Sequence, residues 1–167
     1  MIRIGILALV LGAIIGAPGA FAQAPGPTVV PLTAITADDG TLDLSGYLGR
    51  VVYLDFWASW CRPCRGSFAW MADMHAVYAD RGLVIVAVNV DRDGEKARRF
   101  LEREATPFGV VFDPDATLAR ELALEAMPSS FLYGADGIRR LSHTGFRDGD
   151  TEELERAIAA ALKEAQK

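Results

Sequence analysis

Two runs of almost uninterrupted apolar residues constrain the fold of this chain more than any other feature of its sequence. The runs are Val51–Trp57 and Leu83–Val90. A strand that is apolar at nearly every position is buried on both faces, as in the middle of a parallel sheet. Between the runs, the segment from about Cys61 to Asp80 has apolar residues at helical spacing, and Gly82 ends it. The pattern therefore predicts two central strands joined by a long helix.

Shorter patterns extend this arrangement on both sides. Thr41–Leu44 alternates as a short strand does, and Ser45–Arg50 has the composition of a turn. After the second buried strand we expect a helix at Glu95–Glu104, a strand at Val110–Phe112, a helix at Ala116–Leu124, a hairpin of Ser130–Tyr133 with Ile138–Gly145, and a helix from Thr151, its N-cap, to about Lys163. The fold class is α/β, with a central mixed β-sheet flanked by helices.

The N-terminus has the features of an export signal. A short positive start precedes the apolar run Ile4–Ile15, and Ala20–Ala22 fits the small-x-small cleavage rule. We expect residues 1–22 to be a cleaved signal peptide, 23–31 a linker and 32–167 the folded domain. The uncharged stretch Ile4–Ala24 leaves an uncleaved membrane anchor as the alternative. Both interpretations place the domain in the periplasm, where disulfides persist.

Charge and motifs exclude several classes of function. The 167 residues fit one domain, and the formal net charge is -5, with Lys and Arg scattered singly or in pairs. This distribution does not indicate a nucleic-acid surface. Because no nucleotide- or flavin-binding motif occurs, we expect the protein to carry no cofactor of its own.

The segment Trp60–Cys64 places two cysteines where a buried strand passes into a helix. The first turn of a helix has unpaired N–H groups and the positive end of the dipole, so a thiolate there is stabilised and its pKa falls. Cys61, at the exposed end, is the predicted nucleophile, and Cys64, one turn deeper, is the predicted second thiol. Arg62 adds positive charge, and Pro63 suits a first helical turn.

A cysteine pair can also form a structural disulfide or bind a metal ion. A bridge between residues three apart closes a very small loop and contributes little stability, which disfavours a structural disulfide. A structural zinc site needs four ligands, and only His75 and His143 could join the cysteines. We therefore expect no such metal site. A Cu(I) carrier that uses the two thiolates remains an alternative.

Two residues near the cysteines have predicted roles. Asp55 interrupts the first apolar strand, and a buried carboxylate has a raised pKa. It could relay a proton to or from Cys64, unless it turns to solvent or pairs with a Lys or Arg. Trp60 is expected to shield one side of Cys61 and to pack against substrate.

These segments resemble a known family. Asp55–Cys64 resembles the active-site segment of thioredoxin, and Met127–Ser129 resembles the segment where that fold has a cis-proline facing the cysteine pair. Together with the signal segment and a long stretch between the two motifs, the chain is most similar to the TlpA/ResA-type exported thiol–disulfide oxidoreductases of the thioredoxin-like superfamily. The resemblance implies a thioredoxin fold with an N-terminal extension and an extra helix–strand insertion at Asp91–Phe112.

The resemblance also implies an activity and a site. It implies reduction of disulfides in exported proteins, of the cytochrome c or metal-site maturation type, through a Cys61/Cys64 dithiol that a membrane thiol reductant regenerates. Pro128 would be cis and face the cysteines. The backbone of Met127 would pair with the substrate chain, and Trp60, Arg62 and Pro63 would contact it. We expect a monomer, because Cys61 must stay accessible. A disulfide-donating oxidase or isomerase is the main alternative.

The chain departs from that family at three positions. Ser67 stands where several members have a glutamate, and Ala69 stands where thioredoxin often has a proline that kinks the helix. Asp55 is the thioredoxin residue, where this branch often has asparagine. We therefore expect Asp55 to be the acid–base group, and we expect a straighter helix.

Overall fold

The computed structural model describes residues 35–37, 40–42, 44–104 and 106–167. The predicted signal peptide, linker and first residues of the domain lie outside these ranges. Within them, no helix has both the length and the apolar character needed to cross a membrane.

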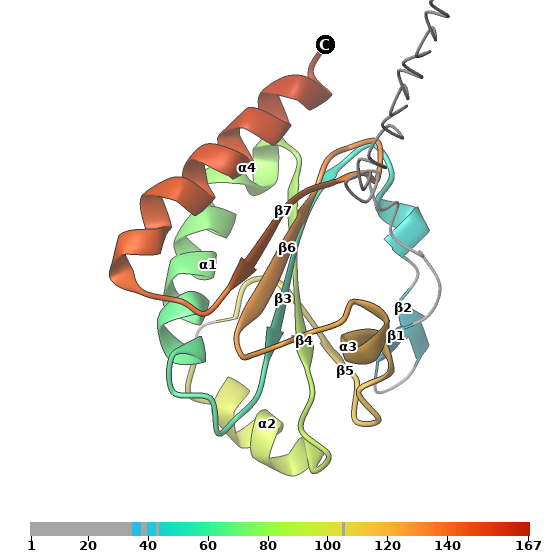
Figure 1. Cartoon of the computed structure of the whole chain (residues 1–167), viewed down its shortest axis with the longest axis vertical. Helices are drawn as coiled ribbons and strands as arrows, with labels where there is room; N and C mark the ends of the chain where they lie inside the picture. The colour runs from blue at the N-terminus through green and yellow to red at the C-terminus, as the bar shows by residue number, and fades with distance from the viewer. Residues whose placement is uncertain (1–34, 38–39, 43, 105) are drawn as a thin grey trace, which may run out of the picture.

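A five-stranded mixed sheet forms the centre of the fold (Figure 1). In chain order the strands are β3 (Val51–Trp57), β4 (Leu83–Asn89), β5 (Gly109–Phe112), β6 (Ser129–Tyr133) and β7 (Arg139–Thr144). Their order across the sheet is β5-β4-β3-β6-β7. β3, β4 and β5 are parallel, whereas β6 pairs antiparallel with β3 and with β7. The predicted mixed sheet, its two buried strands and its hairpin are confirmed.

A small hairpin precedes the sheet, where a single strand was predicted. It consists of β1 (Ile35–Ala37) and β2 (Gly40–Leu42), and β1 lies beside β5. The 3-10 turn η1 (Leu44–Tyr47) begins before the predicted turn at Ser45. The strand predicted at Thr41–Leu44 is therefore shorter at its carboxyl end.

Four α-helices flank the sheet in the part of the chain that the structure describes: α1 (Cys64–Tyr78), α2 (Gly94–Leu101), α3 (Thr117–Glu121) and α4 (Thr151–Ala165). Figure 1 shows α1 and α4 together on one side of the sheet. α1 begins at Cys64, later than predicted, because Pro63 is its N-cap. The segment after α1 is the 3-10 turn η2 (Ala79–Arg81), which Gly82 ends as predicted.

Three other helix boundaries differ from the predictions. α2 ends at Leu101 and not at Glu104. α3 is shorter than the predicted 116–124, because Ala116 and Ala123 adopt left-handed backbone angles at φ 52°. The predicted N-cap role of Thr151 is wrong: the 3-10 turn η3 (Asp148–Asp150) runs directly into α4, and the Thr151 hydroxyl donates to the Asp148 carbonyl.

The two faces of β3 bury two separate core clusters. Tyr53 and Trp57 belong to the cluster that contains both cysteines and residues of α1 and α4, whereas Leu54 and Phe56 belong to the cluster that contains residues of α3. In the first cluster, the ring of Phe68 in α1 lies 4.8 Å from that of Trp57 and 5.1 Å from that of Phe100 in α2. Such edge-to-face contacts hold the start of α1 and the last turn of α2 against the end of β3.

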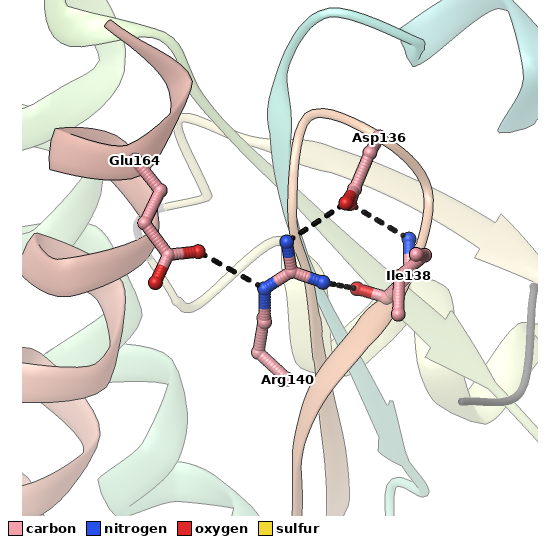
Figure 2. A network of polar contacts seen from close by, with 4 residues as sticks. All are labelled: Asp136, Ile138, Arg140 and Glu164. Carbon is pink, nitrogen blue, oxygen red and sulfur yellow. Dashed lines mark hydrogen bonds and ion pairs between the residues drawn. The ribbon is translucent and has the colours of Figure 1, made fainter. Parts of the chain in front are cut away.

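A polar network fastens the far end of α4 to the turn between β6 and β7 (Figure 2). The Arg140 guanidinium binds the Asp136 carboxylate at 2.8 Å and the Glu164 carboxylate at 3.1 Å, and it donates to the Ile138 carbonyl at 3.1 Å. The Asp136 carboxylate also accepts from the Ile138 N–H. These partly exposed contacts hold the last turn of α4 on the hairpin, at the opposite end of the helix from η3.

Gly82 is the position at which we expect a small substitution to destabilise the fold. Its φ is 103°, and an added Cβ would meet nothing closer than 3.8 Å. The cost of an alanine here therefore comes from the left-handed backbone angle and not from a steric clash. We expect Gly82→Ala to lower the free energy of unfolding by about 1–2 kcal/mol. Gly149 is the matched control, because its φ is not positive and its surroundings are open. Urea unfolding should show Gly149→Ala within about 0.5 kcal/mol of the parent; equal losses for both would contradict the assignment.

Candidate active site

The two cysteines form a disulfide at the start of α1. Their Cα atoms are 5.4 Å apart. Cys64 is the first residue of the helix and is fully buried, whereas Cys61 lies in the preceding loop and keeps 4% of its surface exposed. Of the two cysteines, Cys61 is thus the one with exposed surface, which is the asymmetry that the predicted roles require.

The loop before the disulfide is fixed by a buried carboxylate that the sequence analysis did not identify. Asp91 accepts hydrogen bonds from the Ser59 N–H at 2.8 Å and from the Ser59 hydroxyl at 3.1 Å. The Asn89 side chain holds Asp91 in turn, by donating to its carboxylate at 2.9 Å and accepting from its N–H at 3.0 Å. The signal was available: polar residues at the carboxyl end of a buried parallel strand lie beside the loop of the neighbouring strand.

Asp55 lies in the middle of β3 and is completely buried. The Ser130 hydroxyl donates to one of its oxygens at 2.7 Å, and the Ser67 hydroxyl lies 3.5 Å from the other. The alternatives of a solvent-facing side chain or an ion pair with Lys or Arg do not hold for the described residues. Burial raises the pKa of Asp55 to about 7, against the opposing effects of the two serine hydrogen bonds.

Ser67 connects this carboxyl group to the cysteines. Its hydroxyl donates to the carbonyl of Cys64 at 2.9 Å, one helical turn earlier. Since a hydroxyl has one proton, the shorter bond to Cys64 is the dominant one and the 3.5 Å contact with Asp55 is weak. Asp55 therefore lies under the first turn of α1. Ser130 is a second residue that sequence reasoning missed, because only the pairing of β3 with β6 brings it to Asp55.

The other predicted site residues lie around Cys61. Trp60 is 69% exposed, and Arg62 and Pro63 are exposed beside it. Trp60 thus presents a large apolar surface to solvent next to the disulfide. Trp57 is instead a core residue.

The peptide bond between Met127 and Pro128 is cis, as the resemblance implied. β3 and β6 pair so that Phe56 lies opposite Ser129, which puts Pro128 beside the carboxyl end of β3, where the active-site loop begins. Met127 packs against the core cluster that contains both cysteines. The motif near residue 128 thus lies at the end of β3 from which the chain leads into the active-site loop.

A metal site is not visible among the described residues, where no group of three or more His, Cys, Asp and Glu side chains could hold an ion. His143 lies on β7, with its Nε2 atom 3.2 Å from the Asp150 carboxylate. His75 is on α1 and half-buried.

Solved structures of other proteins have a similar fold. The chain is 45% identical to a protein of Chlorobium tepidum that is assigned as a thiol:disulfide interchange protein DsbE; the two structures match over 81% of this chain and 96% of the other, with a TM-score of 0.78. A thioredoxin family protein from Chlorobium tepidum TLS, 22% identical, matches over 81% of this chain and 97% of its own with a TM-score of 0.68, which supports the fold alone.

Comparison of sequences also finds thiol-disulfide oxidoreductases. The thiol-disulfide oxidoreductase ResA of Bacillus subtilis is 32% identical over 96 residues, which are 58% of this chain and 54% of that protein. The ResA of Geobacillus kaustophilus is likewise 32% identical, over 94 residues. The chain thus spans about half the length of the curated relatives it matches. The Redoxin family model matches residues 21–161, most of the chain. With its thioredoxin-like fold and cysteine pair, the chain belongs to the redoxin family.

Proposed function

We propose that this protein is a periplasmic thiol–disulfide oxidoreductase that reduces disulfides in exported proteins, of the cytochrome c or metal-site maturation type. The observation that carries the proposal is the Cys61–Cys64 disulfide at the start of α1, in which only Cys61 reaches the surface. The similarity to ResA and DsbE-type proteins supports the same chemistry.

In the first step, the thiolate of reduced Cys61 attacks one sulfur of a substrate disulfide. A new S–S bond joins Cys61 to the substrate, and the other substrate sulfur leaves as a thiolate. The start of α1 and the nearby Arg62 favour the thiolate form of Cys61. Trp60, Pro63 and the backbone of Met127 are the proposed contacts of the substrate chain.

In the second step, Cys64 attacks Cys61 and releases the second substrate thiolate, which leaves the protein oxidised and the substrate reduced by two electrons. Cys64 must first lose its proton. Asp55 lies under the same helical turn and has a pKa of about 7, so near neutral pH it can accept that proton, directly or through a water molecule. Asp55 is thus the proposed base, and it returns the proton to solvent afterwards.

The oxidised protein needs a source of electrons for another cycle. The periplasm is kept oxidising and supplies no thiol pool, so the proposed donor is a membrane-bound thiol reductant. The predicted export signal at residues 1–22, or the alternative N-terminal anchor, would bring the domain to that donor. A monomer suits this exchange, because Cys61 must meet two different partners in turn.

The reduction potential of the Cys61–Cys64 pair tests the proposal and its direction. The protein would be equilibrated in graded thiol buffers and its redox state read from tryptophan fluorescence, since Trp60 adjoins the disulfide. We expect a value near about -270 mV, that of thioredoxin. A value near about -120 mV would make the protein an oxidant that donates disulfides. Stoichiometric Cu(I) binding by the reduced protein without disulfide turnover would support a copper carrier instead.

A further inference from the structure

A cavity of about 270 Å³ lies beside the redox pair, between the start of α1 and α2. Ser59 and Arg65 line one side of it. They lie two residues before Cys61 and one residue after Cys64, so the cavity adjoins the active-site loop directly. Residues of α2 and of the turn after it line the other side.

The lining of this cavity is strongly basic, although the protein as a whole has a formal net charge of -5. Four exposed cations lie around it with a single carboxylate: Arg65, Lys96, Arg99 and Arg103, with Glu104. None of these four cations has an ion-pair partner among the described residues. The positive charge is therefore a local feature that no ion pair within the described ranges neutralises.

The spacing along α2 makes this charge distribution costly for the helix. Lys96 and Arg99 are three residues apart in α2, so they lie on one face of the helix and repel one another. Arg103 follows in the turn after the helix and lines the same cavity. The same helix forms an ordinary ion pair elsewhere, between Glu95 and Arg98 at 4.0 Å. A face of uncompensated like charges beside a reactive group favours an anionic ligand.

The position of the cavity in the sheet indicates what kind of ligand this is. α2 connects β4 to β5, on one side of β3, whereas Met127 and Pro128 precede β6, on the other side. Figure 1 shows α2 at the end of the sheet toward which β3 points. Cys61 therefore lies between the basic cavity and the proline loop. A polypeptide whose disulfide reaches Cys61 has both surfaces within its path, one on each side of the attacked sulfur.

We propose that this basic cavity binds acidic side chains of the substrate polypeptide next to the cysteine that Cys61 attacks. The inference rests on the proposed function, because it names the class of disulfide that the site selects. The volume of about 270 Å³ is below the roughly 300–1,000 Å³ of sites for drug-sized molecules, so it suits side chains of a longer chain.

The test compares three peptides of equal length, each closed by one disulfide, with Asp, Ser or Lys beside the attacked cysteine. The reduced full-length protein would reduce each in a single turnover, followed by tryptophan fluorescence. At low salt we expect the Asp peptide to react about tenfold faster than the Ser peptide, and the Lys peptide more slowly. The preference should fall toward unity at 1 M salt, where the screening length is about 3 Å.

Charge reversal assigns the preference to the cavity. Arg99→Glu should abolish or invert the ratio of the Asp rate to the Ser rate. Lys163→Glu, an equal change of charge on an exposed residue in the last turn of α4, should keep the wild-type ratio. That end of α4 lies far from α2 (Figure 1).

The outcomes separate this inference from the proposed function. Equal rates for all three peptides, or a ratio that Arg99→Glu does not change, would overturn the inference and leave the oxidoreductase activity standing. If no peptide is reduced at all, the proposed function fails instead. Binding of the wild type, but not of Arg99→Glu, to phosphatidylglycerol vesicles without any peptide preference would reassign the cavity to lipid head groups and overturn the proposal.

Discussion

Cys64→Ser is expected to turn the protein into a trap that keeps its substrates covalently attached. Cys61 can still attack a substrate disulfide in this variant, because it alone has exposed surface. Without the second thiol the mixed disulfide has no internal route to release. Non-reducing electrophoresis of periplasmic extracts should then show adducts that disappear on reduction, and mass spectrometry of these adducts would identify the substrates.

Cys61→Ser is the matched control. It removes the nucleophile, and we expect the exchange rate to fall by about 10³-fold or more, as for the loss of the nucleophile in other covalent catalysts. No adducts should form, since Cys64 is fully buried. Adducts on Cys64 in this variant, or an empty trap in Cys64→Ser, would contradict the assigned order of the two cysteines.

The parts of the fold that the sequence predicts well are those with local signals. β3 is apolar along its whole length because both of its faces are buried, and its predicted bounds at Val51 and Trp57 are those of the structure. The cysteine pair and Asp55 follow from the same segment. The bounds of α3 were missed because alanine gives no local sign of the left-handed angles at Ala116 and Ala123.

The supporting residues of the site could not be predicted, because their contacts join distant segments. Ser130 is 75 residues from Asp55 and meets it only through the pairing of β3 with β6. Asp91 is 32 residues from Ser59 and holds the active-site loop from the end of β4. The basic cavity likewise depends on packing, since α2 and the start of α1 meet through Phe68 and Phe100. Sequence patterns located the cysteine pair, and tertiary structure shows which residues lie around it.

Asp55→Asn is expected to slow disulfide exchange by about 100-fold at pH 7, at the low end of what a general base contributes. In the wild type the single-turnover rate should rise with pH up to about 7, where Asp55 becomes ionised, and then level off. In the variant the rate should be lower and should continue to rise above pH 7, because the Cys64 thiol must then lose its proton without a carboxylate to accept it. Asp73→Asn, on the exposed face of α1, should retain the wild-type profile.

Asp55→Asn lowers the exchange rate, but it should make the protein more stable relative to the wild type as the pH rises. This pH dependence separates a proton-accepting role of Asp55 from a structural one. The folded protein holds the Asp55 proton more tightly than the unfolded chain, because burial raises its pKa from 3.8 to about 7. Its contribution to stability is therefore full below about pH 4 and is lost as the pH rises through 7. At about 1.4 kcal/mol per pH unit, the loss reaches about 4 kcal/mol. Asparagine does not ionise, so its contribution does not change with pH. In urea unfolding of the oxidised proteins, the free energy of unfolding of Asp55→Asn should therefore rise relative to that of the wild type between pH 4 and 7. A constant difference across this range would mean that Asp55 does not titrate there, and the proton relay through this residue would have to be abandoned.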